Sequence, residues 1–197
     1  MSFTLMPARF SAFSEAGAGP VSMIAGSEPI EAKERMRARG LSPVFSRMGA
    51  ADREAAFGLF LAFLQADPHY QEVASVYGDG GPAALERALD LFVARPDLGF
   101  VWMGRRGGEV VACCVACFAI STSRGTLVAK LDDVNVRPGL EGQGIGSAML
   151  ASLKDELRRA GATRIDTATH FDNPGARRFY ERHGFASLRE ERLSCLL

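Results

Sequence analysis

The segment from Leu131 to Leu157, LDDVNVRPGLEGQGIGSAMLASLKDEL, constrains this 197-residue chain more than any other. An extended run with two adjacent acids, Asp132 and Asp133, meets Pro138, and a glycine-rich turn at 141–146 then opens directly into an amphipathic helix. Glycines let the backbone turn back with its N–H groups exposed. The first turn of a helix adds unpaired donors at the positive end of its dipole. This order predicts a binding site for a diphosphate.

Spacing excludes two better-known phosphate loops. A P-loop has Lys and Ser/Thr directly after its second glycine, whereas Ile145 and Gly146 follow Gly144 here. A dinucleotide-binding fingerprint has a third glycine at the position that Ser147 occupies. The ligand is therefore expected to belong to a different class of phosphate compound.

The pattern resembles the coenzyme A loop of the GNAT-type N-acetyltransferases, which reads Arg/Gln-x-x-Gly-x-Gly/Ala after a strand ending in Val-x-Pro. Residues 136–138 and 144–146 match, but the first position is Glu141, an acid that would repel a diphosphate. The resemblance implies acetyl-CoA as cosubstrate, bound chiefly by backbone N–H groups. The residues it assigns to this binding in the strand and loop are Val134, Val136, Glu141, Gly142, Gln143, Gly144, Ile145, Gly146 and Ser147.

A second motif follows downstream. The stretch FDNPGARRFYERHGF, residues 171–185, resembles the family's Asn-x-x-Ala-x-x-x-Tyr-x-x-x-Gly-Phe helix. Local rules agree with a helix here, because Asn173 is a good N-cap, Pro174 suits the first helical position and Gly184 suits a helix stop. The resemblance implies that Asn173 hydrogen-bonds the pantetheine arm and that Tyr180 is the catalytic acid.

Periodicity predicts the order of the other elements. We expect a strand from residue 41, helices over 52–65 and 82–95, strands over 100–103, 110–120 and 126–136, a helix from 145 to about 160, a strand over 163–169, the Tyr180 helix and two short C-terminal strands. This is an α/β fold, a mixed sheet with helices on both faces, in which a right-handed crossover makes the strands beside the glycine-loop helix parallel. The resemblance implies a mostly antiparallel sheet whose central parallel pair splays apart.

Composition bounds the organisation. We expect one GNAT-like domain over 41–197, with residues 1–40, rich in Ala, Gly, Ser and Pro, as an N-terminal tail or short helix. The formal net charge is +0, which indicates neither a nucleic-acid nor a membrane-surface partner. No apolar run approaches the ~18 residues of a membrane span, and no signal peptide is recognised, so a cytoplasmic location is expected. The oligomeric state stays open, and the resemblance adds a homodimer as one arrangement.

The cysteines and histidines do not indicate a metal site. Cys114 and Cys117 form a C-x-x-C, but in an extended strand they point to opposite faces. The three histidines supply no second pair of ligands. We expect no bound metal, and the cysteines of this strand to behave as small apolar residues.

Acetyl transfer from a thioester to an amine requires a neutral amine, a stabilised oxyanion and a stabilised or protonated thiolate. Strand alternation places Asp132 on the face of Val134 and Val136, where apolar neighbours raise a carboxyl pKa, so we expect Asp132 to be the better base. Asp133 lies on the other face, unless a bulge reverses the assignment. The pair also resembles the Glu-Asp of diamine and polyamine acetyltransferases. A water relay, anchoring of the ammonium, or a structural salt bridge are alternative roles.

The remaining requirements have candidates in the resemblance. Backbone N–H groups around Val134 to Val136 would bind the thioester carbonyl, and the Tyr180 phenol, with an ordinary pKa near ~10, can protonate a thiolate of pKa near ~8.5. The segment 67–81, with its acids and aromatics, would shape the acceptor site or be an ordinary polar loop. We expect a small primary amine, polyamine-like or amino-acid-like, as acceptor. The alternative is a non-catalytic acyl-CoA-binding module of the same fold.

Overall fold

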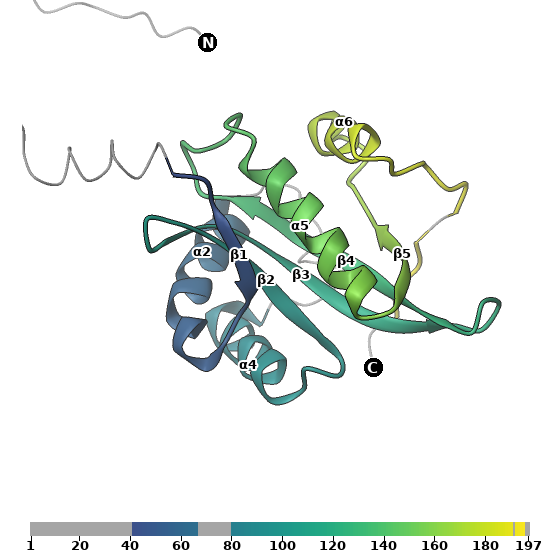
Figure 1. Cartoon of the computed structure of the whole chain (residues 1–197), viewed down its shortest axis with the longest axis horizontal. Coiled ribbons are helices and arrows are strands. Elements are labelled where there is room, and N and C mark those ends of the chain that lie inside the picture. The colour runs from purple at the N-terminus through teal and green to yellow at the C-terminus, as the bar shows by residue number, and fades with distance from the viewer. Residues whose placement is uncertain (1–40, 67–79, 191, 196–197) are drawn as a thin grey trace, which may run out of the picture.

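A computed structural model describes residues 41–66, 80–190 and 192–195 (Figure 1). The expected N-terminal extension over 1–40 and most of the expected acceptor segment over 67–81 lie outside the described residues. The described elements are, in chain order, β1 (Val44–Arg47), η1 (Ala50–Asp52), α2 (Arg53–Ala66), α4 (Gly81–Ala94), β2 (Gly99–Arg106), β3 (Glu109–Ser121), β4 (Thr126–Val136), α5 (Ile145–Arg159), β5 (Ala162–Thr167) and α6 (Pro174–Arg182).

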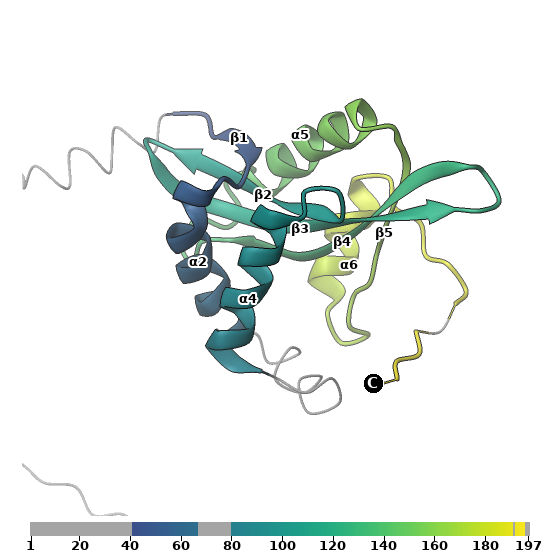
Figure 2. The same cartoon turned by 90° about the horizontal axis from the view of Figure 1, so that it is seen from below.

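The five strands form one mixed sheet in the order β1-β2-β3-β4-β5. Neighbours are antiparallel from β1 to β4, and β4 and β5 are parallel. Helix α5 connects the parallel pair, which confirms the expected crossover. Helices α2 and α4 cover one face of the sheet and α5 covers the other, as the edge-on view of Figure 2 shows. The expected α/β class, with helices on both faces, is confirmed.

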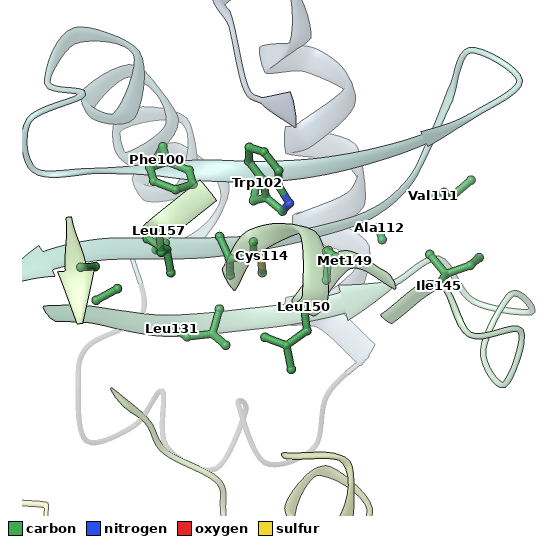
Figure 3. Packing of buried hydrophobic residues seen from close by; sticks show 14 residues of the cluster. Phe100, Trp102, Val111, Ala112, Cys114, Leu131, Ile145, Met149, Leu150 and Leu157 are labelled. Atoms are coloured by element: carbon green, nitrogen blue, oxygen red, sulfur yellow. The ribbon is translucent and has the colours of Figure 1, made fainter. Parts of the chain in front are cut away.

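Helix α5 is held by an apolar stripe that packs on the sheet (Figure 3). Its five buried residues are the five that the periodicity selects, namely Ile145, Met149, Leu150, Leu153 and Leu157. They join strand residues that include Phe100, Trp102, Cys114 and Leu131. The glycine loop before α5 is thereby attached to a rigid helix, because the stripe fixes that helix against the four strands β2 to β5.

The opposite face of the sheet has its own smaller core. Leu59, Phe60 and Leu89 from α2 and α4 pack against Val101 and other residues of β2 and β3. The cysteines of β3 alternate between the two cores: Cys114 belongs to the α5 side, whereas Cys113 and Cys117 lie on the α2 side. The expectation that Cys114 and Cys117 face opposite ways is confirmed.

The parallel pair separates before β4 ends. The register pairs β4 with β5 from Leu127–Ala162 to Leu131–Thr167, and β4 then continues alone on that side to Val136. The Thr167 hydroxyl donates to the Leu131 carbonyl at 2.9 Å where the pairing ends. The acid-bearing part of β4 is therefore not paired with β5, which agrees with the separation of the parallel pair that the resemblance implied.

The expectation of two C-terminal strands is wrong for the described residues. Neither 186–190 nor 192–195 contains a strand, and Leu188 and Leu193 are exposed. A strand needs a neighbouring edge and a buried face, and the apolar residues of this segment have no buried face there.

Candidate active site

A bulge in β4 shapes the acid-bearing segment. Cys113 pairs with Asn135 and Val115 pairs with Asp132, so two residues of β4, Asp133 and Val134, lie opposite Cys114 alone. Asp133 has a φ of 52°, the one positive φ of a non-glycine residue in the part of the chain that the structure describes. Aspartate tolerates this left-handed conformation better than most residues, and bulges frequently re-aim side chains beside active sites.

The bulge overturns the expected faces of the two acids. Val134 packs on the α5 side together with Leu131, although strict alternation would place these two residues on opposite faces. Asp132 pairs with Val115, whose side chain belongs to the α2-side core. Asp132 therefore does not share a face with Val134, because the inserted residue shifts the alternation by one position.

Asp132 lies beside a cation. Its Oδ2 is 2.6 Å from the Nζ of Lys130, and its side chain is about a quarter exposed, at 28%. This ion pair matches one of the alternative roles for the acids, a salt bridge at the surface of the sheet.

We expected a raised carboxyl pKa at Asp132, but it is the pKa of Asp133 that is raised. Desolvation by the surrounding protein is the main cause that raises the pKa of Asp133 to about 6, the negative charge of Asp132 adds to it, and Lys130 opposes it. Asp133 is nevertheless a solvent-exposed residue. The exposed surface makes the carboxyl reachable from solvent, and the protein packed around it accounts for the direction of the pKa shift.

Tyr180 of α6 lies near both acids. Its pKa is raised to about 12, chiefly by burial and further by Cys114, Asp132 and Asp133, while a side-chain hydrogen bond with Thr167 acts in the opposite direction. The ring is half-buried between Phe179 and Phe185, with centroid separations of 5.3 Å and 5.2 Å. A phenol held in this way stays protonated at neutral pH and is available as a proton donor.

Thr167 is a site residue that the sequence did not reveal. It ends β5, donates to the Leu131 carbonyl and hydrogen-bonds the Tyr180 phenol. It therefore links the Tyr180 phenol to β4 next to the acids. A single threonine at the end of a strand carries no motif, so the signal exists only in the tertiary structure.

The glycine loop has the backbone that an anion site needs. Gly139, Gly142 and Gly144 all have left-handed φ values, between 72° and 82°. Gly144 is the N-cap of α5 and has no side chain to cap the helix. The first intrahelical bond runs from the Ala148 N–H to the Gly144 carbonyl at 2.9 Å, so the amides of residues 145–147 have no acceptor within the helix. These features fit a diphosphate.

Side chains around the loop are organised as well. The Glu141 carboxylate accepts from the Gly139 N–H at 2.7 Å, and Gln143 accepts from Arg106 at 2.9 Å. Ile145 is buried, so its contribution to binding would come from its backbone. An added Cβ on Gly146 would be 3.5 Å from Phe179 of α6, which shows how closely this helix approaches α5.

Asn173 caps α6 as predicted. Its Oδ1 accepts from the Ala176 N–H at 2.9 Å, and Pro174 occupies the first position of the helix. The cap engages Oδ1 of the side chain. Gly184, with a φ of 84°, follows the helix end.

Part of the expected site cannot be placed. His69, Tyr70, Glu72, Tyr77 and Asp79 of the acceptor segment lie outside the described residues. Among the described residues, no group of three or more His, Cys, Asp and Glu side chains could hold a metal ion. No helix in the described ranges combines the length and apolar character needed to cross a membrane.

The fold is that of an α/β protein with a glycine turn before α5, and the comparisons with known proteins assign the chain to a family. The model of the acetyltransferase (GNAT) family matches residues 64–185. The chain therefore belongs to the acetyltransferase (GNAT) family and is an acyltransferase. Acetyl-CoA is the cosubstrate of this family.

Two curated relatives are named as acetyltransferases. The chain is 28% identical over 134 residues to the aminoalkylphosphonate N-acetyltransferase of Salmonella typhimurium strain LT2, covering 68% of this chain and 79% of the relative. It is 32% identical over 117 residues to the IAA acetyltransferase of Azospirillum brasilense, covering 59% and 73%. A solved structure of a probable acetyltransferase has a TM-score of 0.65 at 18% identity, over 78% of this chain and 97% of the other, which shows the shared fold.

Proposed function

We propose that this acyltransferase moves the acetyl group of acetyl-CoA directly to the primary amine of a small molecule, polyamine-like or amino-acid-like. The observation that carries the proposal is the proximity of two groups with opposite protonation tendencies. Asp133, with a pKa of about 6, is ionised at neutral pH, and Tyr180, with a pKa of about 12, is protonated. Paired groups whose environments separate their pKa values are the pattern of acid–base catalysis.

Asp133 acts on the acceptor in this proposal. The raised pKa of the Asp133 carboxyl lies closer to the pKa of the ammonium that the carboxylate must deprotonate. The remaining difference of several pKa units favours a water relay. The carboxylate also attracts a cationic amine to the part of β4 that is not paired with β5. Asp132 adds a second negative charge there and is held by Lys130. The proton that the ammonium loses passes to Asp133 or its water and then to solvent.

Tyr180 acts on the leaving sulfur. As the amine nitrogen forms the new C–N bond and the C–S bond breaks, the phenol gives its proton to sulfur, and the second proton of the nitrogen restores the phenol. Backbone N–H groups of residues 134–136 are the proposed donors for the thioester carbonyl. Gly142, Gln143, Gly144, Ile145, Gly146 and Ser147 hold the diphosphate, and Asn173 holds the pantetheine arm.

The nature of the acceptor rests on charge and on the relatives. Two adjacent carboxyl groups suit a cationic amine. The relative named aminoalkylphosphonate N-acetyltransferase is named for a small amine-bearing compound. Both observations support a small amine, rather than a protein N-terminus, as the acceptor.

The test is a panel assay. The protein is incubated with acetyl-CoA and separate polyamines, amino acids and aminoalkylphosphonates, and release of free thiol is followed. Saturable release with at least one small primary amine, and none with the matching tertiary amine, is expected. Calorimetric binding of acetyl-CoA without release across the panel would instead support the non-catalytic acyl-CoA-binding module. Release only with an amino-terminal peptide would overturn the small-molecule acceptor.

A further inference from the structure

Arg106 is a buried cation at the end of β2, with 8% of its surface exposed. Its Nη1 donates to the Gln143 Oε1 at 2.9 Å, and its buried Nε has no hydrogen-bond partner in the part of the chain that the structure describes. Among the described residues, no carboxylate forms an ion pair with Arg106. Arginine is almost never buried in this state, because a buried charge requires a compensating charge or full hydrogen bonding.

The partner of Arg106 lies inside the glycine loop. Gln143 stands between Gly142 and Gly144, both in the left-handed conformation, and Gly144 is the N-cap of α5. The hydrogen bond therefore ties a buried guanidinium to the turn that presents the free amides of α5. Gln143 itself is exposed, so this bond reaches from the core to the surface where a ligand binds.

The neighbouring arginine shows that this placement is specific. Arg105 points to the other side of the sheet, where its Nη2 lies 2.6 Å from Asp52 and its Nη1 donates to Ser46 at 2.9 Å. Arg105 thus has the ion pair that Arg106 lacks. One of two adjacent arginines stabilises the fold locally, and the other is aimed at the loop.

The loop also carries an acid that a diphosphate site must offset. Glu141 is exposed in the loop, and its carboxylate accepts from the Gly139 N–H. It places a negative charge in the loop and engages one of its amides. A nearby cation that lacks a carboxylate partner would restore the charge balance when two phosphates bind.

We propose that Arg106 is a positioning residue of the diphosphate site. It acts through Gln143, which it holds in place so that the turn at 142–144 keeps its amides exposed, and its charge offsets that of Glu141. This inference rests on the proposed function, because it takes the loop to hold the diphosphate of acetyl-CoA. The Nε without a partner marks a cation whose compensating negative charge arrives with the ligand.

The test compares Arg106→Gln with the wild-type protein and with Arg105→Gln as the matched control on the same strand. Calorimetry with coenzyme A should show binding weakened about tenfold or more in Arg106→Gln, as expected for the loss of one charge-assisted contact, and changed less than about twofold in Arg105→Gln. In steady-state assays the KM for acetyl-CoA should rise by a similar factor, with kcat within about twofold. With S-acetylpantetheine, which lacks the diphosphate, Arg106→Gln should leave kcat/KM nearly unchanged.

Two further variants keep the test decisive if Arg106→Gln does not fold. Gln143→Ala cuts the link on the exposed side and should also weaken coenzyme A binding, whereas Arg106→Lys should restore part of the affinity by keeping the charge. Unchanged affinity in both Gln143→Ala and Arg106→Gln would overturn the proposal, as would an equal loss for acetyl-CoA and S-acetylpantetheine. A wild-type protein that does not bind coenzyme A would overturn the proposed function, and with it the need for a cation here.

Discussion

The hydroxyl of Thr167 donates a hydrogen bond to the carbonyl of Leu131 at 2.9 Å, at the last position where the parallel strands β4 and β5 pair. Beyond it β4 continues with Asp132 and Asp133, and the same hydroxyl contacts the Tyr180 phenol. One side chain thus closes the paired part of the sheet and contacts the phenol that we propose as the proton donor.

Replacement of Thr167 by valine keeps the shape of the side chain and removes both hydrogen bonds. We expect the free energy of unfolding to fall by about 1 kcal/mol, because a buried carbonyl loses its partner. Turnover should also fall, because the phenol loses a contact that orients it. Urea denaturation measures the first effect and steady-state assays the second.

The control is Thr163→Val, because Thr163 lies on β5 like Thr167. This variant removes an exposed hydrogen bond between the Thr163 hydroxyl and the Thr126 hydroxyl of β4, and it should change stability by less than about 0.5 kcal/mol. Equal effects of the two variants would contradict the role of Thr167.

Tyr180→Phe should lower kcat by about 100-fold or more, within the range that a general acid contributes, and leave the Kd of acetyl-CoA within about twofold. The reason is that in the proposed mechanism the phenol acts on the leaving sulfur, whereas the variant keeps the ring packing with Phe179 and Phe185. Single-turnover assays and calorimetry separate the two quantities. Equal losses in turnover and affinity would show that Tyr180 only binds the coenzyme.

The pH dependence of kcat/KM should report Asp133. With a pKa of about 6, its carboxyl becomes ionised as the pH rises through 6, so activity should rise over that range. Asp133→Asn should lower kcat/KM by about 100-fold and abolish this limb of the profile. Asp155→Asn, an exposed acid of α5 paired with Arg158, is the control and should keep the wild-type profile. Persistence of the limb in Asp133→Asn would assign it to another group.

The same carboxyl links stability to pH. The pKa of Asp133 is higher in the folded state than in the unfolded state, where it lies near ~4, so the folded state binds more protons between these values. The contribution of Asp133 to stability is therefore greatest below pH 4 and is lost as the pH rises through 6. Asp133→Asn should stabilise the protein at pH 7 relative to the wild type, and the gain should vanish near pH 4. Thermal unfolding at the two pH values measures this, and a gain that is independent of pH would contradict it.

Glu141→Gln should tighten acetyl-CoA binding by about threefold to tenfold at low salt. The change removes a negative charge from the loop that we propose holds the diphosphate, and the amide oxygen of glutamine can still accept from the Gly139 N–H. Because Glu141 is exposed, the gain should shrink at high salt. Calorimetry at two ionic strengths checks both expectations. Weaker binding in Glu141→Gln would show that the carboxylate supports the loop more than it repels the ligand.

Local rules predicted the parts of this protein that depend on neighbouring residues. The apolar stripe of α5 follows a helical period, so the positions of its five buried residues are the ones that local spacing selects. Asn173 and Pro174 act within one helical turn, so the cap of α6 was predictable too. The left-handed turn at Gly142 and Gly144 follows from the conformational freedom of glycine.

The tertiary structure decided which acid is perturbed, how the site is supported and where the sheet ends. The bulge at Asp133 depends on the register between β3 and β4, a non-local property that shifts the alternation by one residue and that no residue spacing in β4 specifies. The contacts of Thr167 with Leu131 and of Arg106 with Gln143 join segments that are 36 and 37 residues apart in the chain. The sequence by itself determined the helices and the glycine turn before α5, because those follow from local conformational preference. Only the packed sheet determined the pKa of Asp133, because desolvation depends on everything that surrounds the carboxyl.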